Sequence, residues 1–312
     1  MQNPDRNVIY YPNKLYKIEI GQSIKDDEAN KYLQEANLAI HKVLEINKTP
    51  DSIFTIDFPK NLLNKLPDNV KSKVTKELNT TDIRILTATV ALAQKAKAEG
   101  KLTFIEKLDE AYFEINLKEL YEYAGLSKTK YGRFDVKQKG FIRDSLINLH
   151  FKHFFILTNT DKKETMQIKQ LVRVYEYEKK KGLSDKETVK LTVNGMFCNF
   201  EKTDNNTYFN LPSDINTRIR KINTGRQNPS IELFIKTIYR AKHYAKESTV
   251  SYTESKLIEL LNMERYKESR HHGRIVTTLN KSFETAKKLG ILEKWKEEID
   301  KWGNKKFIFF LC

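Results

Sequence analysis

The hydrophobic positions of residues 115–149 recur at helical spacing in two groups, separated by a basic, polar turn. The first group predicts a short amphipathic helix with apolar positions Leu117, Leu120, Tyr121 and Ala124. Gly125 follows, and glycine at a helix end readily takes the left-handed conformation that stops a helix. After residues 127–130, the second group predicts another helix with apolar positions Phe141, Ile142, Leu146 and Leu149. Helix, tight turn and helix are typical of a helix-turn-helix.

A second stretch, from residue 254 onward, repeats this pattern at a constant offset and without a gap. Leu257, Ile258, Leu261, Asn262 and Met263 match Leu120, Tyr121, Ala124, Gly125 and Leu126. Asn262 stands where Gly125 stood, and asparagine tolerates the left-handed conformation better than other residues with a side chain. Farther on, Leu279 and Phe283 match Ile142 and Leu146. The match predicts a repeated DNA-binding motif; the alternative is two unrelated helical hairpins in a lysine-rich protein.

The elements around each motif predict the same order in both halves. In the first half, a helix begins at Thr81 or Asp82 and ends at Gly100, with short strands over 102–104 and 112–115. After the motif, strand-like runs over 150–157 and 166–177 flank a polar turn and predict a hairpin, the wing. In the second half, Ser230 is the expected cap of a helix, a strand covers 249–252, Gly290 closes the long helix, and 291–295 with 306–311 form the wing.

The expected fold class is therefore α+β and helix-rich, with two tandem winged-helix domains and an N-terminal extension. The extension covers residues 1–79, the first domain 80–182, a joining segment 183–228 and the second domain 229–312. Within the extension, residues 1–25 suggest an arm or short strand, 27–46 a helix and 53–58 a short strand. The basic stretch 216–229 is expected to be a linker that could itself touch phosphate.

Composition narrows the class of partner. The 312 residues carry a net charge of +15, with a pI of about 9.4, and 39% of them are hydrophobic. Such a positive field favours nucleic acid as partner, with an anionic membrane surface second. The alternative is a lysine-rich composition without a function, because lysine dominates over arginine.

The cysteines and the apolar runs set the expected location. Cys198 and Cys312 are far apart and form no Cys-x-x-Cys pair, which argues against a zinc site or disulfides. The N-terminus has no apolar signal core, and the apolar runs over 154–157 and 307–312 are too short to span a bilayer. We therefore expect a soluble, cytoplasmic protein without a membrane partner.

Signatures of catalysis are mostly missing from the sequence. There is no phosphate-binding P-loop, no His-Glu-x-x-His and no assignable Ser-His-Asp set. His150 and His153 fall in an expected strand, where side chains three residues apart point to opposite faces and cannot share a metal. His271 and His272 are expected to be phosphate or base contacts at most. We expect no catalytic residues, no metal and no cofactor.

Cationic side chains around both motifs are the candidate DNA-binding residues. In the second motif they are Arg265, Lys267, Arg270, His271, Arg274 and Lys281. Arginine can contact a guanine edge through two hydrogen bonds, whereas lysine mainly neutralises phosphate, so Arg270 and Arg274 are the expected base readers. In the first motif, the outer face of the second helix is expected to carry Lys137, Lys139 and Arg143. The alternative is that these charges are solvated surface.

Residues 80–312 resemble the iteron-binding plasmid replication initiators, which have two winged-helix domains in tandem. The stretches SIELFIKTIYRAKHY and TESKLIELLNMERYKESRHHGRIVTTLNKSF are similar to the second domain of that family, and LNTTDIRILTATVALAQ with INLKELYEYAGLS resembles the first. The N-terminal extension departs from the shorter members of the family.

The resemblance implies a division of labour between the domains. The C-terminal domain would supply most base contacts, with Arg270, Arg274 and Lys281 reading bases or phosphates. The N-terminal domain would contact the DNA backbone through Lys128, Lys130 and Arg133 and would form a homodimer interface. Dimers would repress the protein's own gene, and monomers would open the origin and recruit a host replicative helicase.

The predicted function is a non-enzymatic plasmid replication initiator that binds directly repeated double-stranded DNA sites at an origin. One alternative is a winged-helix transcriptional regulator without an origin role, whose sites would lie only in a promoter. A third alternative is a DNA-nicking or primase-like enzyme, which metal-dependent cleavage of supercoiled plasmid would reveal.

Overall fold

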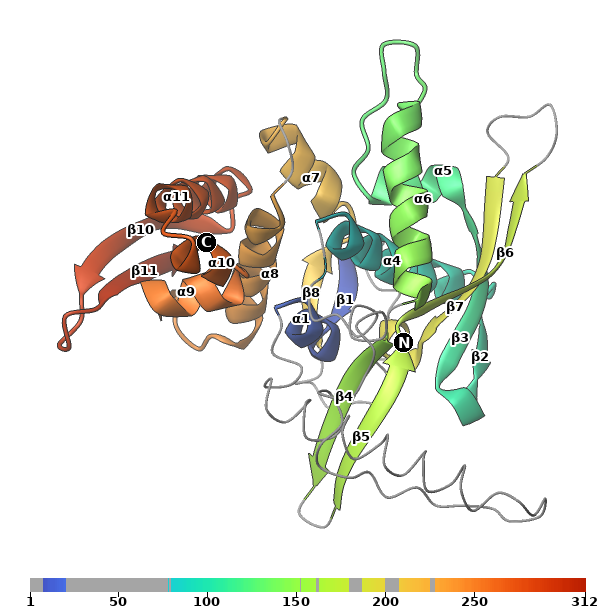
Figure 1. Ribbon diagram of the computed structural model, residues 1–312, viewed down its shortest axis with the longest axis horizontal. Coiled ribbons are helices and arrows are strands. Elements are labelled where there is room, and N and C mark those ends of the chain that lie inside the picture. Colours follow the sequence, from blue (N-terminus) through green and yellow to red (C-terminus); the bar gives the residue numbers. More distant parts are fainter. Residues whose placement is uncertain are drawn as a thin grey trace.

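The computed structural model describes residues 8–20, 78, 80–151, 153–160, 163–179, 187–199, 208–224 and 228–312. This part of the chain is a mixed α/β structure in which the paired strands run antiparallel. Two halves lie on either side of a central region that contains β1, α1 and β8 (Figure 1). The helix expected over 27–46 and the strand expected over 53–58 lie outside the described residues.

The first half is built on helix α4, two further helices and a four-stranded sheet. Its helices are α4 (Thr80–Ala98), α5 (Leu117–Tyr123) and α6 (Val136–Phe151). The sheet has the order β2-β3-β7-β6, and its strands are β2 (Thr103–Ile105), β3 (Glu110–Asn116), β6 (Val172–Lys179) and β7 (Glu187–Asn194). Two 3-10 turns, η2 (Glu106–Leu108) and η3 (Gly195–Phe197), complete it. Gly100 takes a left-handed φ of +69° just after α4, as expected.

A hairpin forms in the run 150–177 as expected, but its strands have different bounds. α6 continues through His150 and Phe151, and the run then forms a separate two-stranded sheet of β4 (His153–Thr160) and β5 (Lys163–Gln170). The chain turns again at Leu171, a fully buried residue, so the end of the run becomes β6 and pairs with β7. β7 falls in the expected joining segment, so that segment contributes a central strand to the first sheet.

The second half repeats the order of elements with fewer strands. Its helices are α8 (Pro229–Tyr244), α9 (Glu254–Leu260), α10 (Glu264–Glu268) and α11 (His272–Lys288). Its sheet has the order β10-β11-β9, with β9 (Thr249–Thr253), β10 (Leu292–Ile299) and β11 (Lys305–Leu311). β10 and β11 form the hairpin expected near the C-terminus.

The N-cap of helix α8 lies two residues before the expected cap. Asn228 is the N-cap, and its side chain accepts a hydrogen bond from the Ser230 N–H at 3.0 Å. Pro229 suits the first helical position because its ring holds φ at a helical value. Its missing N–H costs nothing there, because the first N–H of a helix has no acceptor within the helix. Ser230 instead donates its hydroxyl to the Leu261 carbonyl at 2.8 Å. It therefore ties the start of α8 to the turn after α9.

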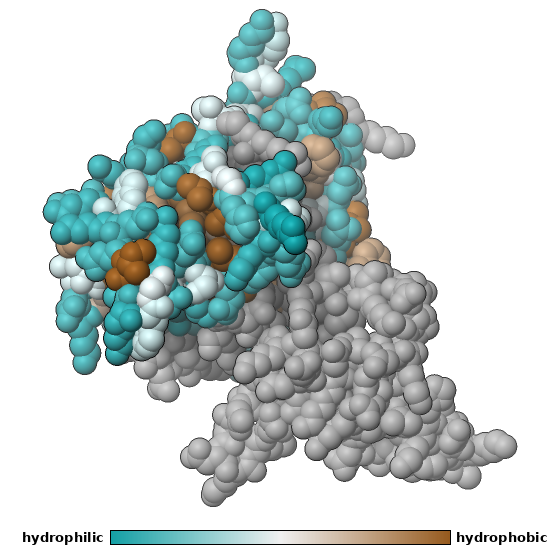
Figure 2. Space-filling model, turned by 60° about the vertical axis from the view of Figure 1, so that its left-hand side comes forward, coloured by the Kyte–Doolittle hydropathy of each residue, from teal (hydrophilic) through white to brown (hydrophobic). Residues whose placement is uncertain are grey.

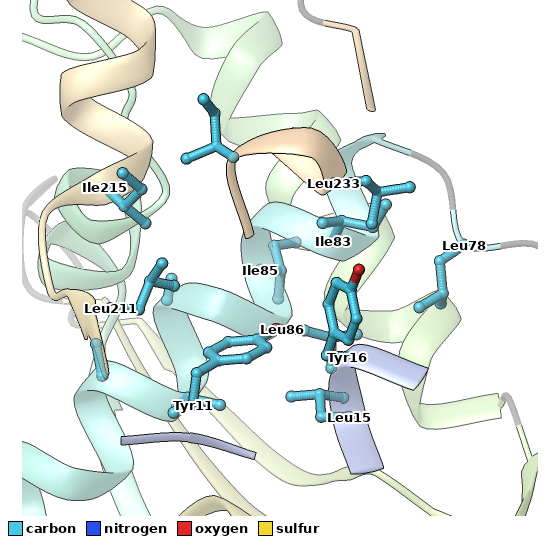
Figure 3. Packing of buried hydrophobic residues seen from close by; sticks show 14 of the residues in the cluster. Tyr11, Leu15, Tyr16, Leu78, Ile83, Ile85, Leu86, Leu211, Ile215 and Leu233 are labelled. Carbon is cyan, nitrogen blue, oxygen red and sulfur yellow. The ribbon is translucent and has the colours of Figure 1, made fainter. Parts of the chain in front are cut away.

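Helices α4 and α8 are enclosed in the middle of the molecule, so their polar side chains need partners. Arg84 donates to the Ala124 carbonyl and lies 3.9 Å from Glu232 of α8. The Asp82 carboxylate accepts a hydrogen bond from Ser145 of α6. Figure 3 shows that side chains of α4, α7, α8, β8 and the N-terminal segment share this core. The two halves therefore pack against each other through buried groups.

The N-terminal segment contacts both halves. β1 (Val8–Pro12) pairs with β8 (Tyr208–Pro212), and α1 (Asn13–Glu19) follows at once. The backbone of Tyr10 exchanges two hydrogen bonds with the Gln94 side chain of α4, at 3.0 and 2.7 Å. On the other side, the Tyr16 hydroxyl lies 2.7 Å from the Thr237 hydroxyl of α8. The first residues include the expected short strand and, in addition, a helix that closes the core.

A buried ion pair anchors α1 to α8. The Lys236 ammonium lies 2.7 Å from both oxygens of the Glu19 carboxylate, and the Tyr11 hydroxyl donates to the same carboxylate at 2.6 Å. Burial raises the pKa of Glu19 and lowers the pKa of Lys236, so burial alone disfavours both charges. Their pairing and the tyrosine hydroxyl offset that cost.

Candidate nucleic-acid interface

The repeated turn expected from the sequence is present in both halves. Gly125 has a φ of +73° and Asn262 a φ of +52°, so both occupy the left-handed region. The next residues close the helices in the same way: Leu126 N–H donates to Tyr121 at 2.9 Å, and Met263 N–H donates to Ile258 at 2.9 Å. The local backbone therefore repeats as the sequence predicts.

The two halves differ after this turn. In the second half, α10 leads into α11. In the first half, residues 126–135 form a loop that projects beyond α6 (Figure 1), and an isolated bridge between Lys128 and Phe134 closes it. The tight turn expected in the first half is thus a longer loop, and α6, which was expected to carry Lys137, Lys139 and Arg143, starts at Val136.

Helix α11 has a buried apolar face and an exposed polar face. The buried face includes Ile275, Leu279, Phe283 and Ala286. The exposed residues at and along the helix include Lys267, Arg270, His271, Arg274 and Lys281. These are five of the six residues predicted for the second motif. Arg270, His271 and Arg274 lie at the helix N-terminus, which also attracts anions, and Lys281 follows two turns after Arg274 on the same side of the helix. The sixth, Arg265, lies in α10, and its side chain is outside the described part.

Arg270 has a left-handed φ of +57° in the turn that connects α10 to α11. His271 N–H donates to the Tyr266 carbonyl at 2.7 Å, so this turn closes as the one at Asn262 does. A non-glycine residue in this conformation costs free energy that the surrounding contacts must offset. The turn projects an arginine at the start of α11.

Helix α6 exposes the cationic residues expected from the sequence only in part. Lys137 is exposed, but Lys139 and Arg143 are only partly exposed at the edges of the buried face. The exposed side also carries large apolar side chains, namely Val136, Phe141, Ile147 and Phe151, among the polar residues Asp144 and Asn148. The periodicity of Ile142, Leu146 and Leu149 located the buried face, but it gave no indication of the apolar side chains on the opposite side. This face is poorly suited to the polar edges of base pairs.

The remaining cations of the first half lie in the projecting loop. Lys128 forms a 2.9 Å ion pair with Glu122 and lies over the ring of Phe134. Lys130 lies over the ring of Tyr131, and Arg133 is exposed. Lys130 and Arg133 are therefore available to contact phosphate, whereas Lys128 already has an acidic partner.

A helix that the sequence did not predict connects the two motifs. α7 (Ile215–Ile222) occupies the start of the expected linker. Asn216 donates to the Tyr123 carbonyl at the end of α5 at 2.9 Å, and Asn223 donates to Thr285 of α11 at 3.0 Å. The signal was the spacing of Ile215, Ile219 and Ile222 at i, i+4 and i+7. Arg218 and Lys221 are on its exposed side, and Arg218 pairs with Asp214.

His150 has a structural role in place of the one considered from the sequence. It lies in the last turn of α6, not in a strand, and its Nδ1 accepts a hydrogen bond from the Val174 N–H at 3.0 Å. This contact fixes β6 beside α6. Within the residues that the structure describes, no group of three or more histidine, cysteine or acidic side chains is arranged to hold a metal ion.

No helix in the described ranges is both long and apolar enough to cross a bilayer. Cys198 is buried, Cys312 is exposed, and both are free thiols. Comparison of the chain with protein-family models and with curated proteins finds no match.

Proposed function

We propose that this chain is a sequence-specific, double-stranded-DNA-binding replication initiator without catalytic activity. The observation that carries the proposal is the exposed surface at the start of α11, where Lys267, Arg270 and Arg274 surround a helix N-terminus. A helix of this kind, backed by an apolar core and followed by a hairpin, suits insertion into a major groove.

We propose further that each half is a winged helix. The second half would use α8, β9, α9, α11 and the hairpin β10–β11 as wing. The first half would use α4, β3, α5, α6 and the hairpin β6–β7, with β4–β5 as an insertion. The matching order of elements, the matching turns at Gly125 and Asn262, and the matching sheet order β3-β7-β6 and β9-β11-β10 support this assignment.

The two halves would have different roles on DNA. α11 would read base edges, with Arg270 and Arg274 in contact with bases and Lys267 and Lys281 with phosphates. The first half would contact only the backbone, through Lys130 and Arg133 in the projecting loop, because large apolar side chains interrupt the exposed polar residues of α6. α7 would extend the basic surface between them. Recruitment of a host helicase rests on the family resemblance alone, whereas homodimer formation rests on that resemblance and on the exposed apolar side chains of α6.

The test has two steps and uses the full-length protein. First, duplexes bound from a random pool are sequenced to find the preferred site. Second, DNA flanking the protein's own gene is footprinted at low and moderate salt. Several evenly spaced direct repeats, protected more persistently than control DNA, support the initiator. Affinity should fall steeply with salt, because each neutralised phosphate releases a counterion.

The other outcomes discriminate among the alternatives. A single site in a promoter, without repeats beside an A·T-rich region, would favour a transcriptional regulator. Metal-dependent nicking of supercoiled plasmid would favour an enzyme. Equal binding to all duplexes would contradict sequence-specific recognition.

A further inference from the structure

The hairpin of β10 and β11 ends in an apolar tip. Trp302 is 74% exposed and Ile299 is 68% exposed, the largest values among the large apolar side chains of residues 228–312. Figure 1 shows this tip projecting away from the rest of the molecule. Exposure of a tryptophan at such a position indicates a contact with a partner rather than a contribution to the core.

The turn that carries Trp302 is held by its own hydrogen bonds. The Asp300 carboxylate accepts from the backbone N–H groups of Trp302 at 2.9 Å and of Asn304 at 2.8 Å. Gly303, with a φ of +81°, completes the turn, and its N–H donates to the Asp300 carbonyl at 3.0 Å. The indole therefore extends from an ordered turn, which lowers the entropic cost of binding a partner.

The cation that lies over the indole favours nucleic acid over protein as the partner, although the hairpin end as a whole, with Glu297, Glu298 and Asp300 opposite three lysines, has no net charge. The Lys301 ammonium lies 4.3 Å from the centroid of the Trp302 ring. Lysine is depleted from the cores of protein–protein interfaces, whereas aromatic rings beside cations are typical of surfaces that stack on bases and neutralise phosphates. The exposed face of this half is mostly hydrophilic with isolated hydrophobic areas (Figure 2). An isolated apolar tip beside a cation matches that pattern.

The tip is placed to act together with α11. The chain reverses between Lys288 and Leu292, so β10 runs back beside the helix (Figure 1). At about 1.5 Å per helical residue and about 3.3 Å per strand residue, α11 and β10 are each roughly 26 Å long. The turn at Trp302 therefore returns toward the end of the molecule where α11 begins, the end that carries Arg270 and Arg274.

We propose that Trp302 is a wedge that inserts, from the minor groove, between base pairs next to the site contacted by α11. This inference rests on the proposed binding of duplex DNA. Apolar side chains inserted in this way unstack a base step and bend the duplex. One indole on a narrow hairpin suits a single base step, whereas single-stranded DNA is usually bound by several aromatic side chains in succession.

The chain itself provides the spectroscopic control, because it has two tryptophans. Trp295 is partly buried, with its ring centroid 5.6 Å from that of Phe283. In Trp295→Phe, Trp302 is the sole emitter, and the selected duplex should quench its emission. In Trp302→Phe, the remaining Trp295 should respond little. Quenching by single-stranded DNA but not by the duplex would overturn the proposal.

A base analogue reports the wedge from the side of the DNA. 2-Aminopurine placed at each step beside the selected site should brighten at one step when the protein binds, because unstacking relieves its quenching. Trp302→Ala should abolish this signal and weaken binding on the order of threefold to tenfold. The effect is modest because the stacking of the indole on a base is partly offset by the cost of unstacking the base step. Trp302→Phe should retain part of the signal.

The outcomes separate this inference from the proposed function. Intact, salt-sensitive duplex binding with an unresponsive Trp302 and no unstacked step would overturn the wedge alone. Absence of duplex binding by the wild-type protein would overturn both. The salt dependence of Trp302→Ala should equal that of the wild type, because the indole neutralises no phosphate.

Discussion

Glu19 and Lys236 form an ion pair at 2.7 Å although 217 residues separate them along the chain. Both side chains are almost completely buried, and the pair joins the N-terminal helix to the middle of α8. We expect Glu19→Ala to lower the free energy of unfolding by about 3–5 kcal/mol, because it leaves a buried ammonium without its carboxylate. Urea unfolding measures the change.

The matched control removes both charges. Glu19→Leu combined with Lys236→Met should recover most of the lost stability, because no unpaired charge then remains in the core. If the single and the double variants are equally destabilised, the pairing is not what matters at this position.

Gly125 should tolerate no side chain. A Cβ atom at this position would lie 2.7 Å from the Asn216 carbonyl oxygen of α7, and the φ is +73°. Gly290 has a similar φ of +70° but open space around it. We expect Gly290→Ala to cost about 1–2 kcal/mol through its backbone conformation alone, and Gly125→Ala about 1–3 kcal/mol more. Equal losses of stability in the two variants would show that α7 does not pack there.

Glu232 should make stability depend on pH. Burial raises its pKa from 4.5 to about 8, against the favourable effect of the nearby cations Arg84 and Lys236. In the folded state this carboxyl holds its proton up to a higher pH than in the unfolded chain. Its contribution to stability is therefore complete below pH 4.5 and is lost as pH rises through about 8.

Glu232→Gln tests this dependence, because glutamine does not titrate. Between pH 5 and pH 8 the wild type should lose up to about 1 kcal/mol per pH unit relative to the variant. Urea unfolding at three pH values gives the difference. A difference between the two proteins that stays constant with pH would show that Glu232 has an ordinary pKa.

Replacement of Arg274 and replacement of Lys281 should have different effects on DNA recognition. Arg274→Ala should cost about 1–3 kcal/mol and relax specificity at one base position. Lys281→Ala should weaken binding to all sequences and lower the salt slope by about 1. Lys107, exposed in η2 of the other half, provides a cationic control whose removal should change little. Equal loss on every sequence for Arg274→Ala would refute base reading.

The apolar face of α6 should support self-association. Phe141 and Ile147 are 54% and 51% exposed on a helix whose opposite face is buried. If two copies pair through this face, Phe141→Ser with Ile147→Ser should shift a dimer to a monomer in sedimentation velocity while the fold stays intact. Lys137→Ser, on the same helix, is the control. A wild type that is monomeric at high concentration would contradict this use of α6.

The parts of the fold that depend on local sequence were predictable. The left-handed turns at Gly125 and Asn262, the end of α4 at Gly100 and the C-terminal hairpin follow from glycine, asparagine and apolar spacing. These features depend on a few neighbouring residues, so the local sequence pattern is enough to predict their conformation.

The parts of the fold that depend on contacts between distant segments were not predictable from the sequence. The pairing of Tyr11 in β1 with Phe209 in β8 has no signature in either segment alone. His150 was expected to begin a strand but lies in the last turn of α6, because packing of that turn overrides the strand propensity of the local sequence. The same distinction applies to the candidate site. The cations expected on α11 are exposed, whereas the apolar side chains exposed on α6 were not expected.

The pairing of the N-terminal segment with β8 and α8 also has a consequence for biosynthesis. A ribosome that adds about 5–20 residues per second completes Lys236 roughly 10–40 seconds after Glu19. For most of that interval Tyr11, Leu15 and Tyr16 lack their partners in β8 and α8, and α4 lacks part of its cover. The nascent chain therefore exposes an apolar surface that chaperones can bind, and translation speed should influence the yield of folded protein.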